Sequence, residues 1–151
     1  MSIEENKQNL KRSMDEVWTQ GNMDKVNEFY ADDLVEHNPY GDIDGIETYR
    51  QFVNVIRETY SNLKVTLHNI IADENFVACN YTVEGKHTGQ VGDVEPTNKQ
   101  VSVPGTFLGR MEDGKIAESW NNFDLASLLM QVGSLEQPSF VQEREGQVRG
   151  G

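Results

Sequence analysis

The stretch EDGKIAESWNNFDLASLLMQVG, residues 112–133, carries the clearest fold pattern of the chain. Its Asp113-Gly114 pair predicts a tight hairpin turn, because these residues accept the left-handed backbone that such turns require. The alternating residues 116–123 then predict a strand. Asp124 is expected to cap a short closing helix by accepting backbone N–H groups. The stretch therefore predicts the last hairpin of a sheet followed by a C-terminal helix.

Upstream of this stretch, apolar residues alternate with polar ones, which predicts further strands. The alternation occurs in residues 63–67, 75–88 and 101–108. Within the last strand, Trp120 alternates with Ser119 and Asn121, so we expect it to face away from both. Most of residues 60–123 should thus form one antiparallel sheet.

The N-terminal part has helical spacing instead. Apolar residues predict helices over residues 3–20, 23–30 and 46–60, with a brief extended piece at 34–37. Asn22 is expected to cap the second helix, and Asp44 with Glu47 to form a capping box at the third.

These elements predict an α+β fold. Three N-terminal helices, about four long antiparallel strands and a short C-terminal helix suit a strongly curved antiparallel sheet that wraps over the helices. Such a cone encloses a pocket, which is the default position for a ligand site. We expect residues 1–133 to form this single domain and residues 134–151 to form a mobile tail.

Composition excludes several classes of function. The chain has 151 residues and a formal net charge of −12, and a surface this acidic repels nucleic acid and anionic membranes. No segment approaches the roughly 20 apolar residues that span a bilayer. Because Cys79 is the single cysteine, we expect a buried thiol in a reducing, cytoplasmic setting.

Six carboxylates gather between residues 32 and 47, with no Lys or Arg among residues 31–49. We interpret this acidic cluster as a solvated surface and helix caps, since it lacks the twelve-residue ligand pattern of a calcium loop. Its members are Asp32, Asp33, Glu36, Asp42, Asp44 and Glu47.

Five stretches, taken in order, resemble the SnoaL-like polyketide (ester) cyclase family, which belongs to the superfamily of nuclear transport factor two and ketosteroid isomerase. They are VWTQGNMDKVNEFYADDLVEHNP (17–39), GIETYRQFV (45–53), GKHTG (85–89), EPTNKQV (95–101) and residues 112–133. The resemblance implies intramolecular aldol closure of a polyketide-like keto ester by acid/base chemistry, with no metal and no organic cofactor.

Two positions depart from the family pattern. Asn121 stands where the characterised cyclases carry their acid/base aspartate, and an amide cannot exchange a proton near neutral pH. Phe107 stands where they carry a pocket histidine. The open alternatives are a hydratase or epoxide-hydrolase-like enzyme, and a non-catalytic ligand-binding or dimerisation module.

Three residues are candidates for the missing acid/base group. His37 titrates near neutrality and could be a base, or it could simply bond a loop carbonyl. His87 could line the pocket or pin the following loop. Asp124 could be a surviving carboxylate or only a helix cap.

The predicted ligand is a small hydrophobic or aromatic molecule, and the resemblance also implies a homodimer. Tyr81 and Phe107 are equally well explained as core residues. The residues predicted to bind the ligand are Asn38, Tyr81, Phe107, Ser119, Asn121 and Phe123.

Overall fold

The computed structural model describes residues 2–136. Its helical elements are α1 (Ile3–Arg12), a π-helical stretch (Ser13–Thr19), a 3-10 turn (Met23–Lys25), α2 (Val26–Phe29), α3 (Ile46–Thr59) and α4 (Leu125–Gln131). Its strands are β1 (Tyr30–Asn38), β2 (Gly41–Asp44), β3 (Tyr60–Ala72), β4 (Phe76–His87), β5 (Gln100–Glu112) and β6 (Lys115–Phe123).

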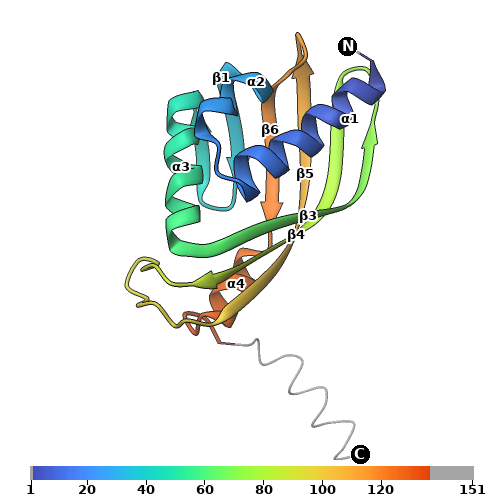
Figure 1. Ribbon diagram of the computed structural model, residues 1–151. Coiled ribbons are helices and arrows are strands. Elements are labelled where there is room, and N and C mark those ends of the chain that lie inside the picture. The colour runs from blue at the N-terminus through green and yellow to red at the C-terminus, as the bar shows by residue number, and fades with distance from the viewer. Residues whose placement is uncertain (1, 137–151) are drawn as a thin grey trace, which may run out of the picture.

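The strands form one curved sheet in the order β2-β1-β6-β5-β4-β3. The long strands β3, β4 and β5 bend beneath α1 and α3, which lie together on one face of the sheet (Figure 1). The predicted α+β cone with a short C-terminal helix is confirmed.

One strand pair has a direction that the sequence did not indicate. β1 pairs with β6 in parallel, whereas the other neighbours pair antiparallel. Residue periodicity reports which face of a strand is buried, not which distant strand pairs with it. The sheet is therefore mixed, and the β1–β6 pair brings the end of β1 beside the predicted site residues of β6.

The second helix is shorter than predicted. Only Val26–Phe29 is α-helical, and Asn22 makes no side-chain cap. Tyr30 begins β1 instead, opposite Ile116 of β6, and its fully buried ring packs on Tyr49 with centroids 4.7 Å apart. The brief extended piece predicted at 34–37 is accordingly a nine-residue strand.

The capping box predicted for α3 is wrong. Gly45 occupies the N-cap position and no side chain caps the helix. Asp44 belongs to β2, where it pairs with Val35, so its backbone follows the strand. At the other end of the chain, the cap on α4 is confirmed, because Asp124 accepts a hydrogen bond of 2.9 Å from the Ser127 N–H.

The hairpin between β5 and β6 is also as predicted. Asp113 and Gly114 have φ values of 50° and 78°, the left-handed conformations typical of a two-residue turn.

The two faces of the sheet have different surroundings. Leu34, Tyr81 and Phe107 are buried on the concave face under the helices. Trp120 faces away from Ser119 and Asn121, as predicted. It lies on the convex face and stacks on His37 with centroids 5.5 Å apart. The helices and the concave face together enclose the core and a pocket.

Two further predictions concern single features. Cys79 is buried, as expected, and burial raises the pKa of its thiol to about 12. The tail predicted over residues 134–151 lies outside the described residues from position 137 onward. Within residues 2–136, no helix is both long enough and apolar enough to cross a membrane.

Candidate functional site

An apolar pocket that opens to solvent lies between the helices and the concave face. Tyr40, which is 49% exposed, stands at the mouth, and its ring packs on Phe52 and Phe123. The lining also includes Met14, Trp18, Tyr49, Ile56, Tyr60, Leu63, Val65, Tyr81, Val83, Glu84, Gly85, Val101, Val103, Phe107, Asn121 and Leu128. Such a wall suits a small, largely apolar molecule.

One polar group projects into this apolar wall from β6. Asn121 is 9% exposed, and its Oδ1 accepts a hydrogen bond of 2.5 Å from the Tyr81 hydroxyl. This bond fixes the orientation of the Asn121 amide group. Because its oxygen accepts from Tyr81, its NH₂ group points away from the Tyr81 hydroxyl. Among residues 2–136 the Nδ2 group has no hydrogen-bond acceptor. It is therefore a donor available to a ligand oxygen.

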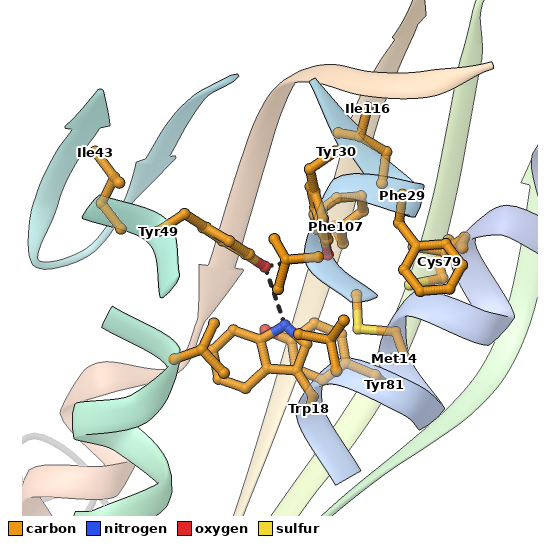
Figure 2. Packing of buried hydrophobic residues seen from close by; sticks show 14 of the residues in the cluster. Met14, Trp18, Phe29, Tyr30, Ile43, Tyr49, Cys79, Tyr81, Phe107 and Ile116 are labelled. Carbon is orange, nitrogen blue, oxygen red and sulfur yellow. Dashed lines mark hydrogen bonds between the residues drawn. The ribbon is translucent and has the colours of Figure 1, made fainter. Parts of the chain in front are cut away.

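A chain of hydrogen bonds runs from Trp18 and Tyr49 on the helix side of the pocket to Tyr30 of β1. Figure 2 shows Trp18, Tyr49 and Tyr30 meeting at this point. The Trp18 Nε1 group donates to the Tyr49 hydroxyl over 3.0 Å, and that hydroxyl donates to Tyr30 over 3.1 Å. Burial is the main cause that raises the pKa of both tyrosines. The pKa of Tyr30 rises to about 12. These groups are neutral hydrogen-bonding groups at physiological pH.

Behind the lining lies a carboxyl group of the acidic cluster. Glu36 has 0% exposure. Its Oε1 accepts from Ser119 Oγ over 3.1 Å and its Oε2 from Asn38 Nδ2 over 3.2 Å. Burial raises the pKa of Glu36 to about 7, although these two hydrogen bonds oppose the shift. A buried carboxyl that titrates near neutrality is a common mark of a functional site.

The assignment of Glu36 to a solvated acidic surface is therefore wrong. Asp32, Asp33, Asp42, Asp44 and Glu47 are exposed, as predicted. Glu36 differs because it follows Leu34 by two positions, and residues two apart on a strand share a face. Since Leu34 is fully buried, Glu36 is buried beside it. The two-residue spacing from the apolar Leu34 is the sequence feature that indicates the burial of Glu36.

The same alternation places His37 on the convex face, away from the pocket. Its Nδ1 lies 2.8 Å from Asp42 and its Nε2 2.8 Å from Glu118. The hydrogen bond to Glu118, followed by that to Asp42, raises the pKa of His37. Asp124 is exposed at the start of α4. Neither residue is among those that line the pocket.

His87 is fully buried at the end of β4 and holds the loop that follows. Its Nδ1 accepts from the Thr97 N–H over 3.3 Å and lies 3.0 Å from Thr97 Oγ1, so its proton is on Nε2. Its ring packs on Tyr60, which lines the pocket, with centroids 5.7 Å apart. Within residues 2–136, His87 Nε2 and the Tyr60 hydroxyl are buried without hydrogen-bond partners.

The predicted binding residues divide into two groups. Tyr81, Phe107, Asn121 and Phe123 line the pocket. Asn38 and Ser119 do not; both bond to Glu36 instead.

The described residues show no arrangement for a metal ion. No group of three His, Cys, Asp or Glu side chains in the described part of the chain is placed to hold one. The chemistry of the pocket is that of a hydrogen-bond donor in an apolar wall, with one carboxyl behind it.

Comparisons with known proteins agree with this architecture. A family model described as SnoaL-like polyketide cyclase matches residues 8–132. No curated protein sequence matches the chain.

Among solved structures, AclR from Streptomyces galilaeus, described as a proposed hydroxylase, is 23% identical with a TM-score of 0.82, over 99% of this chain and 94% of AclR. A proposed SnoaL-like polyketide cyclase from Jannaschia sp. CCS1 is 23% identical with a TM-score of 0.80, over 90% of this chain and 95% of its own. IdmH from Streptomyces antibioticus, a proposed polyketide cyclase, is 21% identical with a TM-score of 0.75. The match covers 85% of this chain and 98% of IdmH. At these identities the likeness concerns the fold.

Proposed function

Because the chain belongs to the SnoaL-like polyketide cyclase family, we propose that it binds a small, polyketide-like keto ester and closes a ring in it by an intramolecular aldol reaction. The reaction needs no redox change. It requires that a proton leave a carbon between two carbonyl groups and that the resulting enolate be stabilised.

The observation that carries this proposal is the Asn121 amide inside an apolar pocket. Its oxygen is occupied by Tyr81, and its Nδ2 group is a donor without an acceptor among residues 2–136. A carbonyl oxygen accepts from such a donor, and the bond strengthens as the oxygen becomes an enolate. The apolar wall favours this change, since it excludes the water that would compete for the oxygen.

A second candidate function is ligand binding without turnover. In the described lining, Glu84 is the single carboxyl residue and no histidine is present. A pocket with so few titratable groups suits storage or transport of a ligand. The two functions differ in product formation, not in affinity.

The experiment that separates them uses ethyl benzoylacetate as binding probe and a panel of keto esters with a second ketone as substrates. We expect wild type to bind the probe and to form cyclised product, detected by mass spectrometry. Asn121→Ala should lower the affinity about tenfold, the loss of one hydrogen bond. Asn122→Ala is the matched control, because Asn122 is the exposed neighbour of Asn121.

Binding of the probe without any product would favour the second candidate. Equal affinity of wild type and Asn121→Ala would contradict the role of Asn121 in both.

We further propose that the chain is a homodimer in the cytoplasm, and that the convex face forms the dimer contact. The register places a row across this face, with Ile71 beside Ala78, Leu108 and Trp120. Ile71 and Leu108 are exposed large apolar side chains, and a contiguous apolar row on a surface favours a protein contact.

A further inference from the structure

Glu36 is a buried carboxyl group without a cationic partner. Among residues 2–136 no Lys or Arg lies within ion-pair distance of it, and its hydrogen bonds come from a neutral hydroxyl and a neutral amide. Neutral donors offset only part of the cost of burying a negative charge. A group in this position therefore resists ionisation.

Glu36 lies close behind the ligand-binding part of the pocket. It pairs with Ser119 across the β1–β6 ladder, and Ser119 lies on the same face of β6 as Asn121, two positions away. Burial is the largest cause of the raised pKa of Tyr81, and the charge of Glu36 is the second. For Tyr49 the charge of Glu36 is the third cause, after burial and the neighbouring Tyr30. Both tyrosines line the pocket.

A second negative charge at this point is unfavourable. An enolate or another anionic oxygen bound at Asn121 and an ionised Glu36 would repel each other through a medium of low polarity. The favourable arrangement has one negative charge, either on the ligand or on Glu36.

We propose that Glu36 holds a proton whenever the pocket binds an anionic oxygen, so that the affinity for anionic ligands depends on the protonation of Glu36. This inference rests on the proposed function, since it concerns the charge of a ligand bound in the same pocket.

The other titratable groups near Glu36 do not compete for this proton. Tyr30, Tyr49 and Tyr81 face it from β1, α3 and β4, and burial raises the pKa of each. They are neutral throughout the range in which Glu36 titrates. Of the remaining charged groups of β1, β2, β6 and α2, His37 and Glu118 lie on the convex face, and the charge of His37 is the smallest of the causes that lower the pKa of Glu36. Lys115 stands at the start of β6, opposite Glu112. The others are exposed: Glu28, Asp32, Asp33, Asp42 and Asp44.

The test is the pH dependence of binding of 2,4-dinitrophenolate, an aromatic oxyanion that stays ionised from about pH 6 to 8.5. With a Glu36 pKa of about 7, each bound anion needs a proton on Glu36, so the affinity of wild type should fall about thirtyfold over this range. Glu36→Gln carries the neutral form permanently. Its affinity should not change with pH and should exceed that of wild type about thirtyfold at the alkaline end. A gain in affinity cannot arise from a misfolded variant.

Glu118→Gln is the matched control, because Glu118 precedes Ser119 on β6 but lies on the opposite face, and it should follow wild type. The same pH slope in Glu36→Gln and wild type overturns the assignment to Glu36. If wild type binds neutral ethyl benzoylacetate but no dinitrophenolate at any pH, the inference fails while the proposed binding function stands. If it binds neither, the proposed function fails as well.

Discussion

The Tyr81 hydroxyl reaches Asn121 Oδ1 across an intervening strand, over 2.5 Å. Tyr81 is on β4 and Asn121 on β6, and the strand between them has Gly105 opposite Tyr81. A Cβ atom on Gly105 would overlap the end of the Tyr81 ring and its hydroxyl. The missing side chain at position 105 thus permits the contact that orients the Asn121 amide.

The first prediction follows from this contact. Gly105→Ala should displace the Tyr81 ring and free the Asn121 amide, so the affinity for ethyl benzoylacetate should fall about tenfold. Titration calorimetry measures the change. Thr106→Ala, on the exposed face of the same strand, should keep the affinity of wild type. If Gly105→Ala also keeps it, Tyr81 does not orient the binding group.

The second prediction concerns His37, which stands on the convex face. His37→Ala should leave ligand affinity and turnover unchanged and should lower stability instead. Because the pKa of His37 is raised by Glu118 and Asp42, the stability it contributes is complete below its unfolded pKa and is lost as pH rises through the folded value.

Chemical denaturation of wild type and His37→Ala at acidic and alkaline pH tests this. The difference in free energy of unfolding should be larger at the acidic pH. Loss of ligand binding in His37→Ala would return this residue to the site.

The third prediction concerns stability and Glu36. A carboxyl whose pKa rises from 4.5 to about 7 on folding stabilises the fold below pH 4.5, and this contribution is lost as pH rises through 7. A shift of this size corresponds to about 3 kcal/mol. Glu36→Gln should therefore unfold with less pH dependence between these values, and should be the more stable protein at pH 8 by a comparable amount. A variant that is less stable than wild type at pH 8 would show that Glu36 is stabilised in its ionised form.

The fourth prediction concerns the convex face. Leu108→Lys introduces a charge into the exposed apolar row beside Trp120, and charges are unfavourable at the core of a protein interface. Light scattering should give a dimer for wild type and a monomer for Leu108→Lys, with an unchanged circular dichroism spectrum. A wild-type monomer would refute the proposed dimer, and a dimeric variant would place its contact elsewhere.

Local patterns in the sequence predicted much of the fold and part of the site. Alternation in β6 placed Ser119, Asn121 and Phe123 on one face and Trp120 on the other, because strand geometry fixes the direction of successive side chains. The cap at Asp124 and the turn at Asp113-Gly114 depend on neighbouring residues alone, so both could be predicted.

Long-range pairing could not be predicted in the same way. The β1–β6 contact joins residues more than eighty positions apart, and nothing in the alternation of β1 specifies its partner. The residues that bury Glu36 come from this long-range pairing. From the sequence alone, the charge of Glu36 favours a position in solvent. Its phase with Leu34 indicated burial, but the acidic residues around it outweighed that indication. The burial of Glu36 and the outward position of His37 have the same origin.

The most direct test of the central claim is a crystal structure of the protein with ethyl benzoylacetate bound. We predict that one carbonyl oxygen of the ligand lies about 2.7–3.2 Å from Asn121 Nδ2, with the aromatic ring against the apolar wall near Phe107. A ligand that occupies the pocket without an oxygen near Asn121, or that binds outside the pocket, would contradict the account.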